Sequence, residues 1–269
     1  MSLVPGVLPP KDNDGGDDFF MGYAKAPKVD RRFWLGAAPL ALLGTTGLSA
    51  AFTHFHSDPG AGAWLTGETF AVTGVLDQAP YPIIRIADAA TPGGVRTVLV
   101  VAEGKCTSGL PFDSVLGQAA TVNGVLIERK GRMMLEVPLL LDKWLTPLDM
   151  FDAADKARLS SPTTEALGPV RLKGAIMDTK CFFGVMRPGR GKTHKACAAL
   201  CIRGGIPPSF YAVDEAGRET VLLLTDANGE ALKDEILPLV ADPLVAEGEI
   251  VRVDDLFHFR VAPENLKRA

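Results

Sequence analysis

The sequence predicts a mainly β protein, with two tandem OB-like small β-barrels behind a single N-terminal transmembrane helix. Three observations lead to this fold class. Residues 33–52 contain no charged side chain, short alternating or β-branched apolar runs dominate the chain after them, and the second half repeats the plan of the first. A composition of 47% hydrophobic and 22% charged residues is typical of a protein folded around apolar cores.

Residues 1–32 form a polar tail rich in Gly, Pro and Asp, which we expect in the cytoplasm. Residues 33–52 are long enough to cross the hydrocarbon core as a helix. No lysine or arginine follows this segment before Arg85, whereas Lys25, Lys28, Arg31 and Arg32 lie shortly before it. This asymmetry predicts a single-pass protein of the inner (cytoplasmic) membrane, in contact with the lipid bilayer, whose C-terminal domains are periplasmic.

The junction "DRRFWLG" has the pattern of a twin-arginine export signal, in which two arginines precede apolar residues. The alternative is that Arg31 and Arg32 only set the orientation of the helix. A signal peptidase could cleave near "SAA" at 49–51, but the long polar tail favours a retained anchor.

The exported part begins with a linker, residues 53–66, and continues with a first OB-like domain at 67–141. A connector at 142–168 contains a helical stretch around 150–159, and a second OB-like domain spans 169–263. Strands of the first domain are expected at 69–77, 82–88, 96–102, 119–129 and 132–141.

The two domains have parallel plans. Residues 170–178 mirror 70–77, residues 244–261 mirror 120–137, and each half has a short apolar stretch that could be helical, at 112–118 and 230–240. Four glycines sit mid-strand, where a barrel strand kinks or bulges, namely Gly74, Gly174, Gly124 and Gly248. These features predict OB-like barrels related by duplication, and the alternative is two unrelated small β domains.

Residues 178–208 hold three of the four cysteines and one of the four histidines. A helix over 194–203, with its N-cap at Thr193 and a stop at 204–205, places His194, Cys197 and Cys201 on one face. The ends of that row are about 10.5 Å apart along the axis, too far for one ion.

The groupings that fit one ion are Cys197 with Cys201, or His194 with Cys197, each completed by Cys181. The candidate metal ligands are therefore Cys181, His194, Cys197 and Cys201, and thiolates suit a copper or zinc ion. The structural alternative is a disulfide between Cys181 and either Cys197 or Cys201, because thiols outside the cytoplasm tend to oxidise.

Other chemistry is excluded or unsupported. "GRGKTHK" ends like a phosphate-binding loop, but Met186 stands where that motif needs its first Gly. We therefore expect no nucleotide, and the pI of about 5.6 argues against nucleic acid. No haem-attachment, zinc-protease or serine-hydrolase motif is present, so no catalytic or cofactor-binding residue is predicted and a non-catalytic protein is favoured over an enzyme.

The pattern DxxC…HxxCAxxCxxGGxPP, within residues 170–212, resembles the signature of a group of small exported bacterial proteins of unknown function. This resemblance implies no mechanism, but it groups Asp178 and Gly204–Gly205 with the four candidate ligands. We expect a membrane-anchored periplasmic accessory or assembly subunit of a respiratory or other redox membrane complex. The alternative is a periplasmic copper- or zinc-binding or thiol-redox protein that uses Cys181, Cys197 and Cys201.

Overall fold

The structure is a computed structural model that describes residues 28–55, 62–106, 115–139, 144–184, 186–214 and 217–269. It divides into two compact units, Met1–Asp58 and Pro59–Ala269, which are described separately. In the first unit, helix α1 (Lys28–Phe55) contains the predicted apolar segment. Within the described residues, the stretch Arg31–His54 of α1 is long and apolar enough to span a membrane, and its large apolar side chains are exposed.

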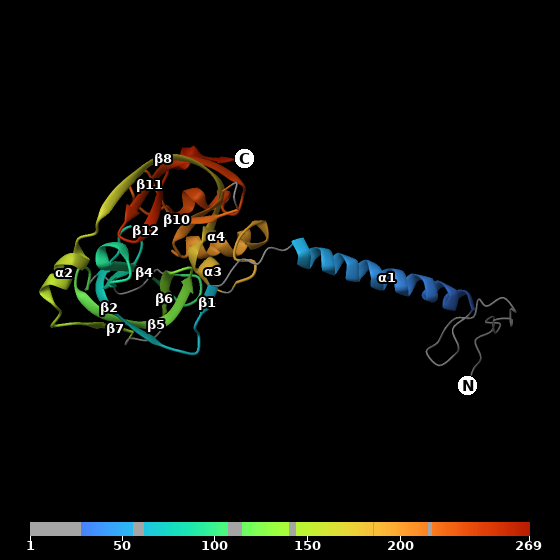
Figure 1. The fold of residues 1–269 in the computed structure, drawn as a ribbon, viewed down its shortest axis with the longest axis horizontal. Coiled ribbons are helices and arrows are strands. Elements are labelled where there is room, and N and C mark those ends of the chain that lie inside the picture. Colours follow the sequence, from blue (N-terminus) through green and yellow to red (C-terminus); the bar gives the residue numbers. More distant parts are fainter. Residues whose placement is uncertain (1–27, 56–61, 107–114, 140–143, 185, 215–216) are drawn as a thin grey trace, which may run out of the picture. The chain divides into compact units, whose positions relative to one another are not determined.

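In the second unit, the first sheet closes into a five-stranded barrel (Figure 1). The strands pair in the order β5–β2–β3–β4–β6, and β6 then pairs with β5 to complete the ring; β4 and β6 run parallel. The short strands β1 and β7 both add to β5. The bounds are β1 Gly62–Trp64, β2 Phe70–Asp77, β3 Ile83–Ala87, β4 Val95–Ala102, β5 Ala119–Arg129, β6 Arg132–Val137 and β7 Leu145–Pro147.

The second sheet repeats this order of pairing. Its strands follow β8–β9–β10–β12–β11, β11 also pairs with β8, and β10 and β12 run parallel. The short strand β13 adds to β11. The prediction of a mainly β protein is therefore confirmed. The bounds are β8 Thr164–Asp178, β9 Pro208–Val213, β10 Glu219–Thr225, β11 Leu244–Val253, β12 Leu256–Arg260 and β13 Leu266–Arg268.

The four mid-strand glycines are points of close approach between strands. A methyl group on Gly74 would overlap the carbonyl oxygen of Arg85 on β3, and one on Gly174 would overlap that of Tyr211 on β9. The other two glycines have the same relation to the last barrel strand of their half, since Gly124 faces Glu136 O and Gly248 faces Arg260 O. Only glycine permits this contact, because any Cβ would force the strands apart. The register shift of β11 lies at Ile250/Val251 instead of at its glycine.

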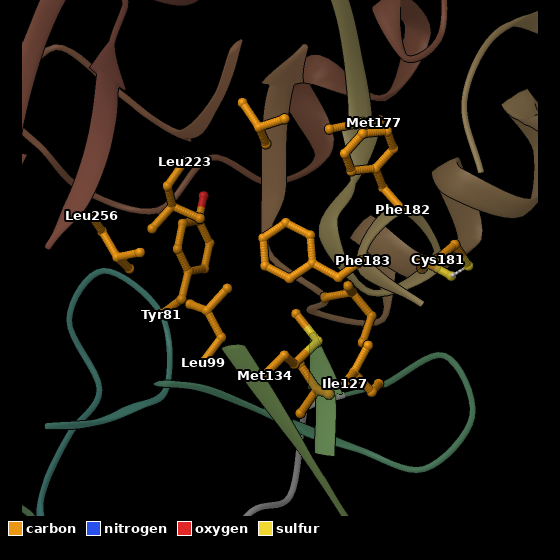
Figure 2. Packing of buried hydrophobic residues seen from close by; sticks show 14 of the residues in the cluster. Tyr81, Leu99, Ile127, Met134, Met177, Cys181, Phe182, Phe183, Leu223 and Leu256 are labelled. Atoms are coloured by element: carbon orange, nitrogen blue, oxygen red, sulfur yellow. Dashed lines mark hydrogen bonds between the residues drawn. The ribbon is translucent and has the colours of Figure 1, made fainter. Parts of the chain in front are cut away.

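Besides its own apolar cluster, each sheet contributes to a joint core that contains residues of both halves (Figure 2). Tyr81, Leu99 and Met134 of the first sheet pack in the same buried cluster as Phe183 and Leu223 of the second half. The Tyr81 hydroxyl also donates to Leu224 O at 2.8 Å and accepts from Leu232 N at 3.1 Å. Residues of the segment 178–208, which holds three of the cysteines and His194, therefore pack in this joint core next to residues of the first half.

Some sequence-based boundaries shift in the structure. The expected helix around 150–159 is α2 (Ala153–Ser160), which begins after Asp152, whose side chain accepts from Asp155 N at 2.9 Å. The expected helix in 230–240 is a 3₁₀ helix, η3 (Asp234–Leu239), in which Pro238 cannot donate a helical hydrogen bond. The expected stretch 112–118 lies partly outside the described residues. Two further 3₁₀ turns are η1 (Pro92–Gly94) and η4 (Pro263–Asn265).

Candidate metal centre

The first thiol of the site is positioned by a cap at the end of a strand. β8 ends at Asp178, and α3 (Thr179–Phe183) follows at once. Asp178 Oδ1 accepts a hydrogen bond from Cys181 N at 2.8 Å, which is the N-cap contact that aspartate makes well. All five residues of α3 are buried, so Cys181 is held between the strand end and the joint core.

The other two thiols come from α4 (Lys195–Arg203), which follows the 3₁₀ turn η2 (Lys192–His194). The predicted N-cap at Thr193 is wrong: Thr193 lies inside η2, and His194 occupies the cap position without a side-chain capping bond. The predicted stop is confirmed, since Gly204 N donates to Leu200 O and Gly205 takes the left-handed φ of 97°. Cys197 and Cys201 are thus one turn apart on α4.

The three cysteines predicted to group lie together. The sulfur atoms of Cys181, Cys197 and Cys201 are all within 4.8 Å of one another. Cys181 and Cys201 are buried and their sulfurs are 3.9 Å apart, while Cys197 is half-buried. All four cysteines of the chain are free thiols in the structure, and a separation of 3.9 Å is well beyond a sulfur–sulfur bond of about 2.05 Å. The structure therefore describes a reduced cluster.

The imidazole ring of His194 contacts the carboxylate of Asp178. Its Nε2 lies 3.0 Å from Asp178 Oδ2, and both side chains are buried. Asp178, Cys181 and His194 form a second compact group of ligand atoms, again within 4.8 Å of one another. Cys181 belongs to both groups, so the carboxylate–imidazole pair stands beside the thiol cluster. Such a pair typically orients a metal ligand, and a role for His194 as a ligand itself stays a prediction.

A fourth group contacts the thiols from the first half of the chain. Lys105, just after β4, donates from Nζ to Cys197 Sγ at 2.7 Å and to Cys201 Sγ at 3.4 Å. A methyl group on Gly204 would overlap the carbonyl oxygen of Lys105, so the end of α4 packs directly on this loop. Sequence reasoning missed Lys105 because it lies 92 residues from Cys197 and carries no local signal.

The groups of the cluster differ in their pKa values. The hydrogen bond from Cys181 to Cys201, together with burial and the Asp178 carboxylate, raises the pKa of Cys181. The same hydrogen bond, helped by the ammonium group of Lys105, lowers the pKa of Cys201 to about 7. The hydrogen bond to Cys197 and the charge of Cys201 raise the pKa of Lys105. Of the two buried thiols, Cys201 is therefore the one that ionises first, and its neighbours are the Cys181 thiol and the Lys105 ammonium group.

Lys180, the neighbour of Cys181, is a buried lysine. It is 2% exposed, and its ammonium group forms an ion pair with Glu136 of β6. It also donates to Ala102 O and Gly104 O, each at 2.8 Å. Trp64 Nε1 donates to the second carboxylate oxygen of Glu136 at 3.0 Å. This buried network ties α3 to the loop that carries Lys105.

The remaining cysteine, Cys106, is half-buried, and its thiol contacts Glu103 O at 3.6 Å. It belongs to neither ligand group among the described residues. Cys106 therefore offers an internal control for the reactivity of the other three cysteines.

No family model matches the chain, and no curated protein sequence matches it. The resemblance of residues 170–212 to a group of exported bacterial proteins therefore stays a prediction. What the structure adds is the proximity of the residues in that pattern: the three thiols are together, and Asp178 is beside His194.

Proposed function

We propose that this protein binds a soft metal ion, Cu(I) in the first place, through the thiolates of Cys181, Cys197 and Cys201. The observation that carries the proposal is the spacing of the sulfurs. Three thiolates around one ion, each about 2.3 Å from it, are roughly 4 Å apart in a trigonal arrangement. Cys181 and Cys201 are 3.9 Å apart, and Cys197 is within the same 4.8 Å limit.

The chemistry of the donors favours the same ion. Thiolates are soft ligands that select Cu(I) and Zn²⁺ over hard cations such as Mg²⁺ and Ca²⁺. Zn²⁺ requires a fourth ligand in a closed structural site, whereas the group of three sulfurs has an ammonium group, Lys105, at its edge. A three-sulfur Cu(I) site needs no further donor. Zn²⁺ completed by His194 is the second choice.

The protein holds this site outside the cytoplasm on a retained membrane anchor. The support is the charge asymmetry around α1, with basic residues only on its N-terminal side, and the exposed apolar surface of that helix. The chain contains none of the catalytic motifs considered above, so the protein serves as an accessory or assembly subunit of a membrane redox complex and not as an enzyme. Co-purification in mild detergent tests this role, and recovery of the full-length chain free of any other membrane protein contradicts it.

The two barrels are OB-like domains related by duplication. The support is the identical order of strand pairing in the two halves, each with one parallel pair, and the matching glycines on the first and fourth barrel strands. Both domains build the site: the second supplies the three thiols, and the first supplies the loop with Lys105 and the Glu136 partner of Lys180. The site is therefore a product of the tandem arrangement.

Competition for Cu(I) tests the proposed function. The full-length protein, purified anaerobically in detergent with a reductant, is titrated with Cu(I) against a chromophoric Cu(I) chelator. We expect one ion per chain. Each of Cys181→Ser, Cys197→Ser and Cys201→Ser should weaken binding by more than the roughly 10–100-fold loss that an outer-shell change causes.

Cys106→Ser is the matched control and should bind as the unmodified chain does. Cys197 is the most informative position, because it is half-buried and its replacement disturbs the core least. Circular dichroism confirms that each variant is folded. Equal Cu(I) affinity in the unmodified chain and the Cys197→Ser variant contradicts the proposal, as does the absence of binding.

A second candidate function, thiol–disulfide exchange, is favoured by the approach of Cys181 to Cys201. A disulfide-bonded oxidant would take two electrons from this pair; the two sulfurs would form a bond, and their protons would pass to the reduced thiols of the oxidant. Mass spectrometry of the chain isolated with its thiols blocked distinguishes the two functions. A Cys181–Cys201 linkage in the isolated protein supports exchange, and three blocked thiols support metal binding.

A further inference from the structure

The loop after β4 gives the thiol cluster a fixed positive charge. Lys105 donates to two of the three sulfurs, at 2.7 Å to Cys197 and 3.4 Å to Cys201. Among the described residues, no carboxylate is paired with Lys105; Asp178, the acid of the site, is engaged by His194 and by the backbone of α3. The cation therefore acts on the cluster and on any ion bound there.

The backbone of the loop that carries Lys105 is held by contacts on both sides. On one side, the ammonium group of Lys180 holds Ala102 O and Gly104 O, the carbonyls that flank the start of this loop. On the other side, the absence of a side chain at Gly204 lets the end of α4 pack on the backbone of Lys105. A buried ion pair and a glycine contact thus fix the backbone of the loop on both sides, while the side chain of Lys105 is exposed to solvent.

We propose that Lys105 is the residue that makes the thiol cluster selective for monovalent Cu(I) over divalent Zn²⁺; this inference rests on the proposed function. An ammonium group hydrogen-bonded to the thiolates lies within about 4–5 Å of an ion that those thiolates share. Its repulsion of a divalent ion is twice its repulsion of a monovalent ion at the same place. The two ions otherwise compete for the same soft ligands, so the ammonium group raises the affinity of the site for Cu(I) relative to its affinity for Zn²⁺.

The size of the effect follows from the exposure of Lys105. With a dielectric constant between that of water and that of a protein surface, one extra unit of repulsion at this distance changes an affinity by about five- to several-hundred-fold. Because the side chain is partly solvated, the lower part of that range applies, and we expect roughly a tenfold change in the ratio of the two affinities.

The test compares three variants of the full-length protein in detergent, under anaerobic reducing conditions. Cu(I) and Zn²⁺ affinities are measured separately, each against a chromophoric chelator of that ion. Lys105→Gln removes the charge and should tighten Zn²⁺ binding about tenfold relative to Cu(I). Lys105→Arg retains the charge and should keep the original ratio, and Lys156→Gln, at an exposed lysine of α2, is the matched control.

Salt offers a readout that a merely structural role of Lys105 would not move. Raising the salt concentration should reduce the preference for Cu(I) in the unmodified chain and in Lys105→Arg, and leave it unchanged in Lys105→Gln. An unchanged ratio in Lys105→Gln, or an equal loss of both affinities, overturns the inference while the proposed function stands. If the unmodified chain binds neither ion, the proposed function fails and this inference falls with it.

Discussion

Replacing Lys180 by Met tests how the two halves of the site are held together. The change keeps a long apolar side chain but removes the ammonium group that forms an ion pair with Glu136 and donates to Ala102 O and Gly104 O. Glu136 is then left as a buried carboxylate that still accepts a hydrogen bond from the indole N–H of Trp64. Breaking one side of a buried ion pair costs about 3–5 kcal/mol, because the other charge stays buried without compensation.

That magnitude is a large share of the 5–15 kcal/mol or so that stabilises a typical domain. The assay is denaturant unfolding of the full-length protein in detergent, followed by tryptophan fluorescence, to which Trp64 contributes directly from the network. The double variant Lys180→Met with Glu136→Gln should recover about 1–3 kcal/mol, since it removes the unpaired charge. Lys156→Met, at an exposed lysine, is the control and should change the free energy of unfolding by less than about 0.5 kcal/mol.

A loss below about 1 kcal/mol in Lys180→Met would refute the reasoning. It would mean that water compensates the Glu136 carboxylate in the variant, and that the loop with Lys105 is held by packing alone. The same variant should also weaken metal binding, because Cys181 follows Lys180 in α3 and the loop beneath it carries Lys105.

Three further predictions concern other parts of the chain. Gly174→Ala should destabilise the folded state by about 2 kcal/mol or more, because its methyl group would overlap Tyr211 O. Gly67→Ala is the control, since open space surrounds Gly67, and the denaturant midpoints of the two variants and the unmodified chain test the difference. Burial lowers the pKa of His258 to about 4, so this side chain is neutral in the folded protein at neutral pH. Because the unfolded chain takes up a proton at higher pH, the free energy of unfolding should fall by up to about 3 kcal/mol as the pH drops from 6.5 to 4. His258→Phe should lose this pH dependence, and an unchanged dependence in that variant contradicts the assignment. Replacing Arg31 and Arg32 by Lys should block export if the twin-arginine pattern is a signal, and normal export in a cell-fractionation assay would leave them as orientation charges only.

Sequence reasoning succeeded where the determining forces are local. The strand expected at 119–129 is β5 with the same bounds, because alternation and β-branched residues act within the strand itself. The grouping of Cys197 with Cys201 follows from helical spacing, since residues four apart lie one turn from each other on the same face. The mid-strand glycines also indicated a barrel, since a glycine within a strand often marks a bulge or a tight bend at a barrel corner.

The parts that could not be predicted depend on contacts between distant segments. Nothing in the sequence around Lys105 or Lys180 indicates their partners, which only the packing of the first half against α3 and α4 supplies. His194 was assigned by its spacing from Cys197, but the turn η2 rotates it toward Asp178. The strands β9 and β10 carry weak alternation because both are almost wholly buried, and such runs resemble buried helix in a single sequence.

X-ray absorption at the copper edge, on the full-length protein loaded with one equivalent of Cu(I), tests the central claim most directly. The account predicts a Cu(I) ion with sulfur neighbours alone at about 2.3 Å, a coordination number near three, and loss of one sulfur in Cys197→Ser. A shell of nitrogen or oxygen ligands, or an identical spectrum for the unmodified chain and Cys197→Ser, would contradict it.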